Sequence, residues 1–113
     1  MVKIEVLIHP FKLDDVKATL DRLHVGVTLI SEVLSHGGPA THKAYYRGAE
    51  YYVDVPRLKL EMLVSSERAD EIIDAVLRVA RTSVPGDDGT ILVYEVADAI
   101  QIRTGAHLQY TLT

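Results

Sequence analysis

Residues 83–90 have a composition suited to holding an anion. They read Ser-Val-Pro-Gly-Asp-Asp-Gly-Thr, with glycines at positions 86 and 89. A glycine lets the backbone approach a ligand closely, and successive backbone N–H groups can surround a phosphate. The same glycines would also suit a simple turn that needs positive φ angles. This segment alone therefore leaves both interpretations open.

Residues 35–56 form a second segment that could carry function. They hold four of the six tyrosines, grouped around an arginine and a glutamate. The segment has about twenty residues, far more than a tight turn needs, and long connections in small domains often bind partners. Aromatic side chains beside an arginine are typical of protein-binding hot spots. The candidate partner-binding residues are Tyr45, Tyr46, Arg47, Glu50 and Tyr51. Alternatively, some of these rings pack onto the domain itself.

The spacing of the polar residues does not predict an enzyme. It offers no Ser-His-acid or paired-carboxylate arrangement for catalysis. Among the five histidines, His36 and His42 share the long connection, but the chain has no cysteine and no carboxylate at chelating spacing near them. We therefore expect no catalytic site and no metal site.

The composition excludes further classes of protein. The 113 residues, 48% hydrophobic and 25% charged, suit one globular domain over residues 1–113. A net charge of −4 with dispersed cations argues against nucleic-acid binding. No stretch approaches the roughly 20 apolar residues of a membrane span, so we expect no membrane insertion. The N-terminal residues do not resemble a signal peptide, and with no cysteines present we expect a cytoplasmic protein.

An internal repeat predicts the scaffold that must position these segments. Residues 3–8, Lys-Ile-Glu-Val-Leu-Ile, recur 56 positions later as Lys-Leu-Glu-Met-Leu-Val. Alternating apolar residues predict strands near 2–8, 27–34, 58–64 and 91–96, and helical spacing predicts helices over 13–23 and from Ser65 or Ser66 to Ala80. The expected fold is α+β, a ferredoxin-like βαββαβ sandwich whose four-stranded antiparallel sheet has both helices on one face.

The sheet face without helices is expected to associate with other copies of the chain. It should carry Leu7, Leu29, Leu63, Leu92 and Tyr94, too apolar a set to remain in water. The C-terminal tail, residues 101–113, alternates over 107–112 like a further strand that could pair with its own sheet or a neighbour's. We therefore expect a homo-oligomer.

Seven short stretches carry a family resemblance through nearly the whole chain. They are 10–16 (Pro-Phe-Lys-Leu-Asp-Asp-Val), 31–33, 46–51 (Tyr-Arg-Gly-Ala-Glu-Tyr), 53–54, 59–61, 80–82 and 102–105 (Ile-Arg-Thr-Gly). In this order they resemble the PII signal-transduction proteins, and the 46–51 and 103–105 stretches are highly specific. The resemblance implies a homotrimer that binds ATP or ADP in clefts between subunits, with 2-oxoglutarate joining ATP through a magnesium ion. It also implies that the long connection docks onto transporters, enzymes or regulators of nitrogen metabolism.

The resemblance also assigns residue roles. Carried over position by position, the nucleotide-binding residues are Gly37, Arg57, Glu61, Gly86, Asp87, Asp88, Gly89, Thr90 and Arg103. Tyr51 falls on the tyrosine that is uridylylated in some members. Ala49 falls on a serine that is phosphorylated in others, so that modification is excluded here.

Two departures from the family pattern concern 2-oxoglutarate. The family's Arg-Gln pair is Gly38-Pro39 here, and proline has no side-chain oxygen to replace the glutamine that binds magnesium and helps hold 2-oxoglutarate. The lysine that pairs with the 2-oxoglutarate carboxylate is Arg57, which keeps the charge but changes the geometry. We therefore expect little or no response to 2-oxoglutarate.

Other departures concern the triphosphate. Gly38, Thr90 and Gln101 stand where the family has cationic side chains, while Arg103 keeps one of two arginines that reach the neighbouring subunit's site. Each lost charge-assisted contact is worth roughly 1.5–3 kcal/mol. ATP binding should weaken by orders of magnitude, whereas ADP or AMP should suffer less.

Two functions are consistent with the sequence. The first is a non-enzymatic, divergent PII-like regulator that senses an adenine nucleotide at subunit clefts, with little 2-oxoglutarate response. It would control a transporter or metabolic enzyme through residues 35–56. The second is a PII-like trimeric module that has lost nucleotide sensing and binds a metal or another small ligand in association with a transporter.

Overall fold

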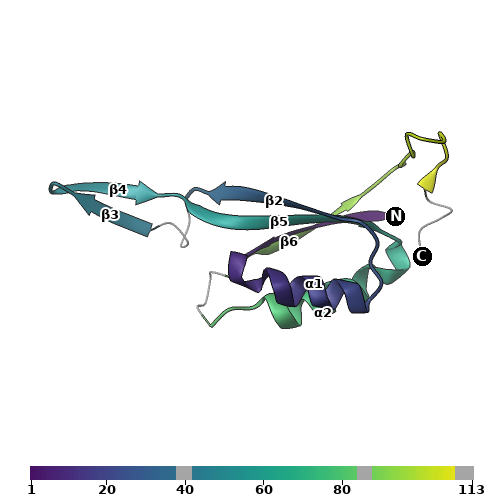
Figure 1. The fold of residues 1–113 in the computed structure, drawn as a ribbon, viewed down its shortest axis with the longest axis horizontal. Coiled ribbons are helices and arrows are strands. Elements are labelled where there is room, and N and C mark those ends of the chain that lie inside the picture. Colours follow the sequence, from purple (N-terminus) through teal and green to yellow (C-terminus); the bar gives the residue numbers. More distant parts are fainter. Residues whose placement is uncertain (38–41, 84–87, 109–113) are drawn as a thin grey trace.

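The chain folds into one four-stranded sheet, two helices and a separate β-hairpin, in a computed structural model that describes residues 1–37, 42–83 and 88–108. The elements are β1 (Val2–Ile8), the 3-10 turn η1 (Pro10–Lys12), α1 (Leu13–Arg22), β2 (Thr28–Ser35), β3 (His42–Tyr46), β4 (Ala49–Val53), β5 (Val55–Val64), α2 (Ser66–Ala80) and β6 (Thr90–Glu95). The strand order β2-β5-β1-β6, antiparallel throughout, confirms the ferredoxin-like arrangement (Figure 1). Gly38, Pro39, Gly86 and Asp87 lie outside the described residues.

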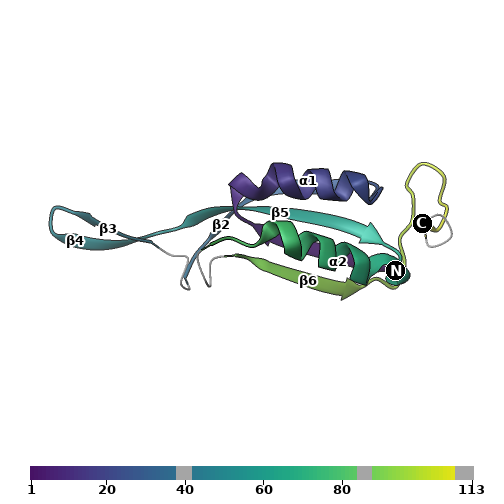
Figure 2. The ribbon, with the colours of Figure 1, turned by 90° about the horizontal axis from the view of Figure 1, so that it is seen from below.

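The two helices cover one face of the sheet (Figures 1 and 2). Every second residue of β1, and of β5 from Leu58 to Val64, is buried against them, as period-2 patterning requires. Helix α1 has Asp14 and Asp15 in its first turn, where the helix dipole favours acids. Helix α2 has Ser65 at its N-cap position, although the side chain makes no capping hydrogen bond. The buried core consists of Val2, Ile4, Val6, Ile8, Val16, Leu20, Leu58, Leu60, Met62, Val64, Ala69, Ile72, Val76 and Ala80.

The internal repeat is expressed as a pseudo-twofold axis in the middle of the sheet. Glu5 of β1 pairs directly with Glu61 of β5, and these two residues are also equivalent positions of the repeat. The axis therefore passes between them, and each copy presents its charged residues to the other on the face without helices.

The long connection over residues 35–56 contains a β-hairpin, an element that was not predicted from the sequence. Strand β2 continues through Ser35, β5 begins at Val55, and β3 and β4 between them form a hairpin that extends away from the sheet (Figure 1). Arg47 (φ 51°) and Gly48 (φ 78°) form its two-residue turn, and positive φ at both central positions matches the twist of a tight hairpin. The tyrosines and Val53 on either side of this turn favour strands. An Arg-Gly pair between such residues is therefore the sequence feature that indicates a hairpin here.

The segment after β6 is a compact turn rather than the start of a regular strand. Ile100 and His107 form an isolated antiparallel bridge, with turn residues between them. The remainder of the alternating pattern, residues 109–112, lies outside the described part of the chain. No helix among the described residues is both long enough and apolar enough to cross a bilayer.

Candidate functional site

The base of the hairpin contains a cavity next to one predicted nucleotide residue. A space of about 520 Å³ lies between the end of β2 and the start of β5, lined by Pro10, Glu32, Leu34, Pro56, Arg57 and Leu58. Arg57 is only 7% exposed, and its Nη1 donates to the Pro56 carbonyl oxygen at 2.9 Å. Gly37, with φ of 83°, follows β2 at the same end of the sheet. These two predicted residues therefore flank the hairpin base.

The start of β6 forms a second cavity close to the first. About 240 Å³ lies between the end of β1, the last turn of α2 and Asp88, Gly89 and Thr90. The Asp88 carboxylate accepts the backbone N–H of Thr82, which ties the strand entrance to the end of α2. Ile8 lines this cavity, and Leu58, its partner in the sheet, lines the cavity at Arg57. The two cavities thus lie at the same end of the sheet.

Gly89 is required by close packing at this point. A Cβ built on it would lie 1.9 Å from the Leu7 carbonyl oxygen, and its φ is +110°. The backbone just before β6 therefore passes so close to β1 that a residue with a side chain would not fit at position 89. Of the two interpretations of the glycines in residues 83–90, the turn interpretation accounts for Gly89 without a ligand.

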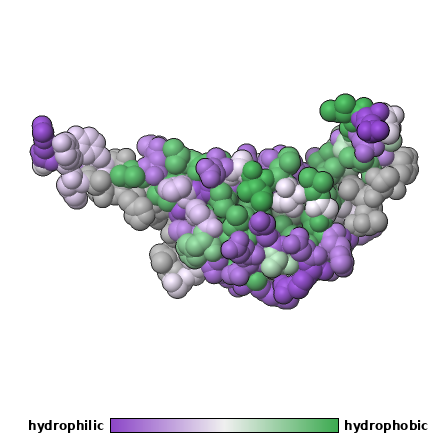
Figure 3. Space-filling model, viewed as in Figure 1, coloured by the Kyte–Doolittle hydropathy of each residue, from purple (hydrophilic) through white to green (hydrophobic). Residues whose placement is uncertain are grey.

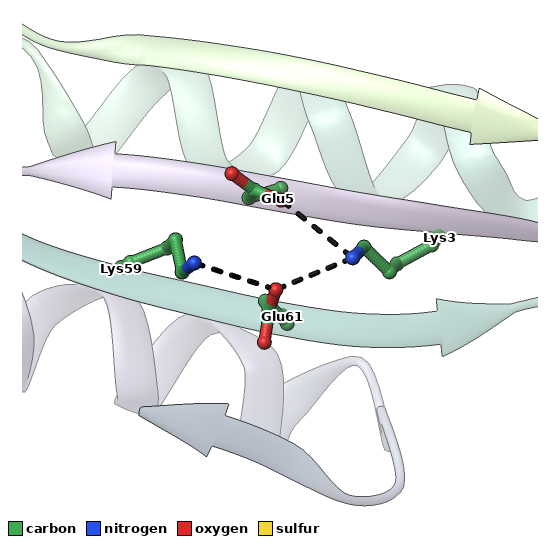
Figure 4. Close-up of polar contacts among 4 residues, drawn as sticks. All are labelled: Lys3, Glu5, Lys59 and Glu61. Atoms are coloured by element: carbon green, nitrogen blue, oxygen red, sulfur yellow. Dashed lines mark hydrogen bonds and ion pairs between the residues drawn. The ribbon is translucent and has the colours of Figure 1, made fainter. Parts of the chain in front are cut away.

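Glu61, another predicted nucleotide residue, lies farther along β5 in a cluster of four charges. Its carboxylate is 3.3 Å from Lys3 Nζ and 3.7 Å from Lys59 Nζ, and Lys3 Nζ is also 3.7 Å from Glu5 (Figure 4). The hydrogen bond to Glu61 raises the pKa of Lys3 above its usual value. Because a raised pKa stabilises the fold only below that pKa, this contribution is lost as the pH rises through the raised value.

The four charges are surrounded by the apolar residues predicted for the face without helices. Register places Leu7, Leu63, Leu92 and Tyr94 opposite members of the cluster on neighbouring strands, and Leu29 opposite Glu61. Leu29 is 61% exposed, and Leu92 and Tyr94 are also exposed. Figure 3 shows hydrophobic residues interspersed with hydrophilic ones over the strands, and mostly hydrophilic residues over the helices. The sequence had indicated the apolar residues but not the charged centre.

Arg103 does not join the two cavities within one chain. It lies in the turn after β6, at the end of the sheet opposite the hairpin (Figures 1 and 2). The 7 residues of β1 separate these ends, a span of roughly 23 Å at about 3.3 Å per residue. Among the described parts of the chain, the predicted nucleotide residues are thus divided between the hairpin end, the sheet centre and the far end.

The predicted partner-binding residues lie on the hairpin. Tyr45, Tyr46 and Tyr51 are 72%, 62% and 50% exposed, so these rings do not pack into the domain. The Arg47 guanidinium lies over the Tyr46 ring at 5.3 Å. Tyr51 lies within β4, opposite Ala44, with half of its surface exposed.

Sequence reasoning missed a hydrogen-bonded pair at the base of the hairpin. His36 Nδ1, just after β2, lies 2.5 Å from Asp54 Oδ1, between β4 and β5. The two residues are 18 positions apart, so no local pattern could have indicated the pair. Within the described ranges no group of three or more potential metal ligands is found, and His36 has this carboxylate as its partner instead.

Comparison with known proteins gives the family. The model of the family "Nitrogen regulatory protein P-II" matches residues 1–106. The chain belongs to the P-II family. The P-II protein of Haemophilus influenzae is 47% identical over 106 residues, covering 93% of this chain and 94% of that protein. The P-II protein of Pasteurella multocida is 44% identical and P-II 1 of Escherichia coli is 42% identical, with the same coverage.

Membership of the P-II family defines the broad role. Proteins of this family are regulators of signal transduction in nitrogen metabolism and not enzymes. The expectation of a non-enzymatic regulator is therefore confirmed. The residue roles and the ligand remain predictions.

Proposed function

We propose that this P-II protein is a cytoplasmic homotrimer that senses an adenine nucleotide at clefts between its subunits. It controls a transporter or metabolic enzyme through the hairpin within residues 35–56. The observation that carries this proposal is the separation of Arg103 from Arg57 and from Asp88–Thr90 by the length of the sheet. A phosphate held by both groups needs Arg103 from a second copy.

The face without helices supports the assembly. Exposed Leu29, Leu92 and Tyr94 surround a cluster with two acids and two bases. Such a face is too apolar to be stable in water, yet its balanced charges allow only certain orientations of a second copy. Covering this face with the same face of other subunits would bury the apolar residues and bring the two ends of neighbouring sheets together.

The cations available at the cleft favour ADP or AMP over ATP. Arg57 and Arg103 remain, whereas Thr90 and Gln101 stand where the family resemblance places cations. The Gln101 amide oxygen already accepts the Thr104 hydroxyl at 2.9 Å, so it is engaged within its own turn. With Pro39 in place of glutamine, the site lacks one side-chain ligand for magnesium. We therefore expect that 2-oxoglutarate does not strengthen ATP binding.

The hairpin is suited to the output. Its exposed Tyr45, Tyr46, Arg47, Glu50 and Tyr51 form the docking segment, and Tyr51 is the candidate for uridylylation. The cavity at Arg57 lies at the hairpin base, where the His36–Asp54 pair joins the two strands that enter it. A ligand there can bias the hairpin without contacting its tip.

Calorimetric titration with ATP, ADP and AMP, with and without magnesium and 2-oxoglutarate, tests the ligand assignment. ADP should bind at least as tightly as ATP, and 2-oxoglutarate should leave ATP affinity unchanged. Thr90→Lys should tighten ATP binding about tenfold, since one charge-assisted contact is worth at least about 1.5 kcal/mol. Asp74→Asn on α2 makes the same change in net charge away from the cleft and serves as the control. Tight ATP binding that 2-oxoglutarate strengthens would contradict the proposal.

A further inference from the structure

The turn that carries Arg103 has a defined shape although it buries little. Gln101 N–H donates to the Ala106 carbonyl oxygen at 2.9 Å, and Leu108 N–H donates to the Ala99 carbonyl oxygen at 2.8 Å. Ile100 is 58% exposed and Ile102 fully exposed, so hydrophobic packing does not hold the turn in place. In Figures 1 and 2 it stands off the end of the sheet. Its shape therefore depends on polar contacts.

One side-chain pair closes this turn at its base. His107 Nδ1 lies 2.9 Å from Asp98 Oδ1 and 2.8 Å from Oδ2, so both carboxylate oxygens are within reach of one ring nitrogen. Asp98 Oδ1 also accepts the N–H of Ala99 at 2.8 Å. The hydrogen bond with His107 lowers the pKa of Asp98, so the carboxylate keeps its charge to lower pH than a free aspartate. Nine residues apart, Asp98 and His107 hold the two ends of the turn together.

Further contacts inside the turn fix its tip. The Thr104 hydroxyl donates to Gln101 Oε1 at 2.9 Å and accepts the Ala106 N–H at 3.1 Å. Gly105 donates its N–H to the Gln101 carbonyl oxygen at 2.8 Å with φ of 71°. Arg103 lies within this tip, and the structure gives it no ion-pair partner among residues 1–37, 42–83 and 88–108. The turn thus presents a cation whose backbone is already ordered.

We propose that Asp98 and His107 are a positioning pair that preorganises Arg103 for the phosphate of a nucleotide held by a neighbouring copy of the chain. This inference rests on the proposed function. Ordering a segment on binding lowers affinity, so a turn that is already closed loses less entropy when its arginine engages an anion. Without the pair, the same arginine would have to be ordered by the ligand. Neither residue touches the nucleotide; both act through Arg103.

A double-mutant cycle on ADP affinity, measured by calorimetry on the full chain, tests this positioning role. His107→Leu should weaken ADP binding about 5- to 20-fold, and Arg103→Ala at least tenfold. His107→Asn, whose amide nitrogen can replace Nδ1 as donor to Asp98, should stay within threefold of wild type. Adding His107→Leu to Arg103→Ala should cause no further loss. Thermal unfolding should be unchanged in each variant because the turn lies outside the core.

Each other outcome has a distinct meaning. If His107→Leu weakens binding equally with and without Arg103, the pair does not act through Arg103 and the inference is wrong. If wild type binds ADP but Arg103→Ala has no effect, the inference fails while nucleotide sensing stands. If wild type binds no adenine nucleotide, the proposed function is wrong, and the positioning role that rests on it is wrong as well. Asp98→Asn, with Asp70→Asn as its charge control, provides a second variant should His107→Leu fold poorly.

Discussion

Gly89→Ala is expected to lower the free energy of unfolding by about 3 kcal/mol or more, since it adds a backbone clash to an unfavourable φ. The new Cβ would lie 1.9 Å from the Leu7 carbonyl oxygen, and this oxygen belongs to β1 in the centre of the sheet. A flexible side chain could move away, but Leu7 O is fixed by the pairing of β1 with both of its neighbours. Denaturant unfolding followed by circular dichroism measures the loss.

Two other glycines separate the causes of this effect. Gly105→Ala tests the effect of positive φ alone, because its φ is 71° and nothing lies within 4 Å of the added Cβ. We expect it to lower the free energy of unfolding by about 1 kcal/mol. Gly26→Ala has neither a positive φ nor a neighbour within 4 Å and should be nearly neutral. A Gly89→Ala protein as stable as Gly26→Ala would show that β6 does not enter the sheet against Leu7.

Gly48→Val is expected to abolish the hairpin while leaving the core intact. Gly48 has φ of 78° in the turn between β3 and β4, and a β-branched residue strongly disfavours that conformation. An isolated two-stranded hairpin is marginally stable at best, so a cost of about 1–2 kcal/mol removes most of its population. Hydrogen exchange of the β3 and β4 amides should accelerate about tenfold, with the melting temperature unchanged. Docking of a partner on this segment should fall with it.

Gly48→Asn is the matched variant for this effect. Asparagine tolerates the left-handed region, so the hairpin and its exchange protection should be largely retained. Loss of protection in both variants to the same extent would mean that the side chain, rather than the backbone angle, is responsible. Retained protection in Gly48→Val would show that Arg47–Gly48 does not determine the turn.

The scaffold could be predicted because its signals are local or repeated. The alternation in β1 and β5 and the helical spacing in α2 each specify an element, and the 56-residue repeat relates the two halves. The apolar positions of the face without helices followed from strand parity. To place these apolar residues on that face, only the pairing register of the strands was needed, and the burial of the opposite face strongly specifies that register.

The hairpin was not predicted because the connection between β2 and β5 has the length of a loop. A connection of about twenty residues suggested a loop, yet the Arg47-Gly48 pair between strand-forming residues indicated two short strands. The hairpin residues whose exposure the structure describes, 45–51 and 53, are all exposed, and the hairpin sequence lacks the alternation of polar and apolar residues that identifies the other strands.

The contacts within the candidate site could not be predicted from local patterns. His36 and Asp54, Lys3 and Glu61, and Thr82 and Asp88 each meet across the fold or around a turn. The division of the predicted nucleotide residues between opposite ends of the sheet also needed the structure. Family resemblance supplied the residues, and the geometry shows that one chain does not bring them together.

The central claim is that a nucleotide bound at the hairpin base changes the conformation or dynamics of the hairpin. Hydrogen exchange of residues 42–53 with and without saturating ADP tests this claim most directly. The account predicts that ADP changes the exchange rate of these amides at least threefold. It also predicts that Arg103→Ala, which weakens ADP binding from the far end of the sheet, reduces this change when ADP is held near the wild-type Kd. Unchanged exchange over residues 42–53, with ADP binding confirmed by calorimetry, would contradict the account.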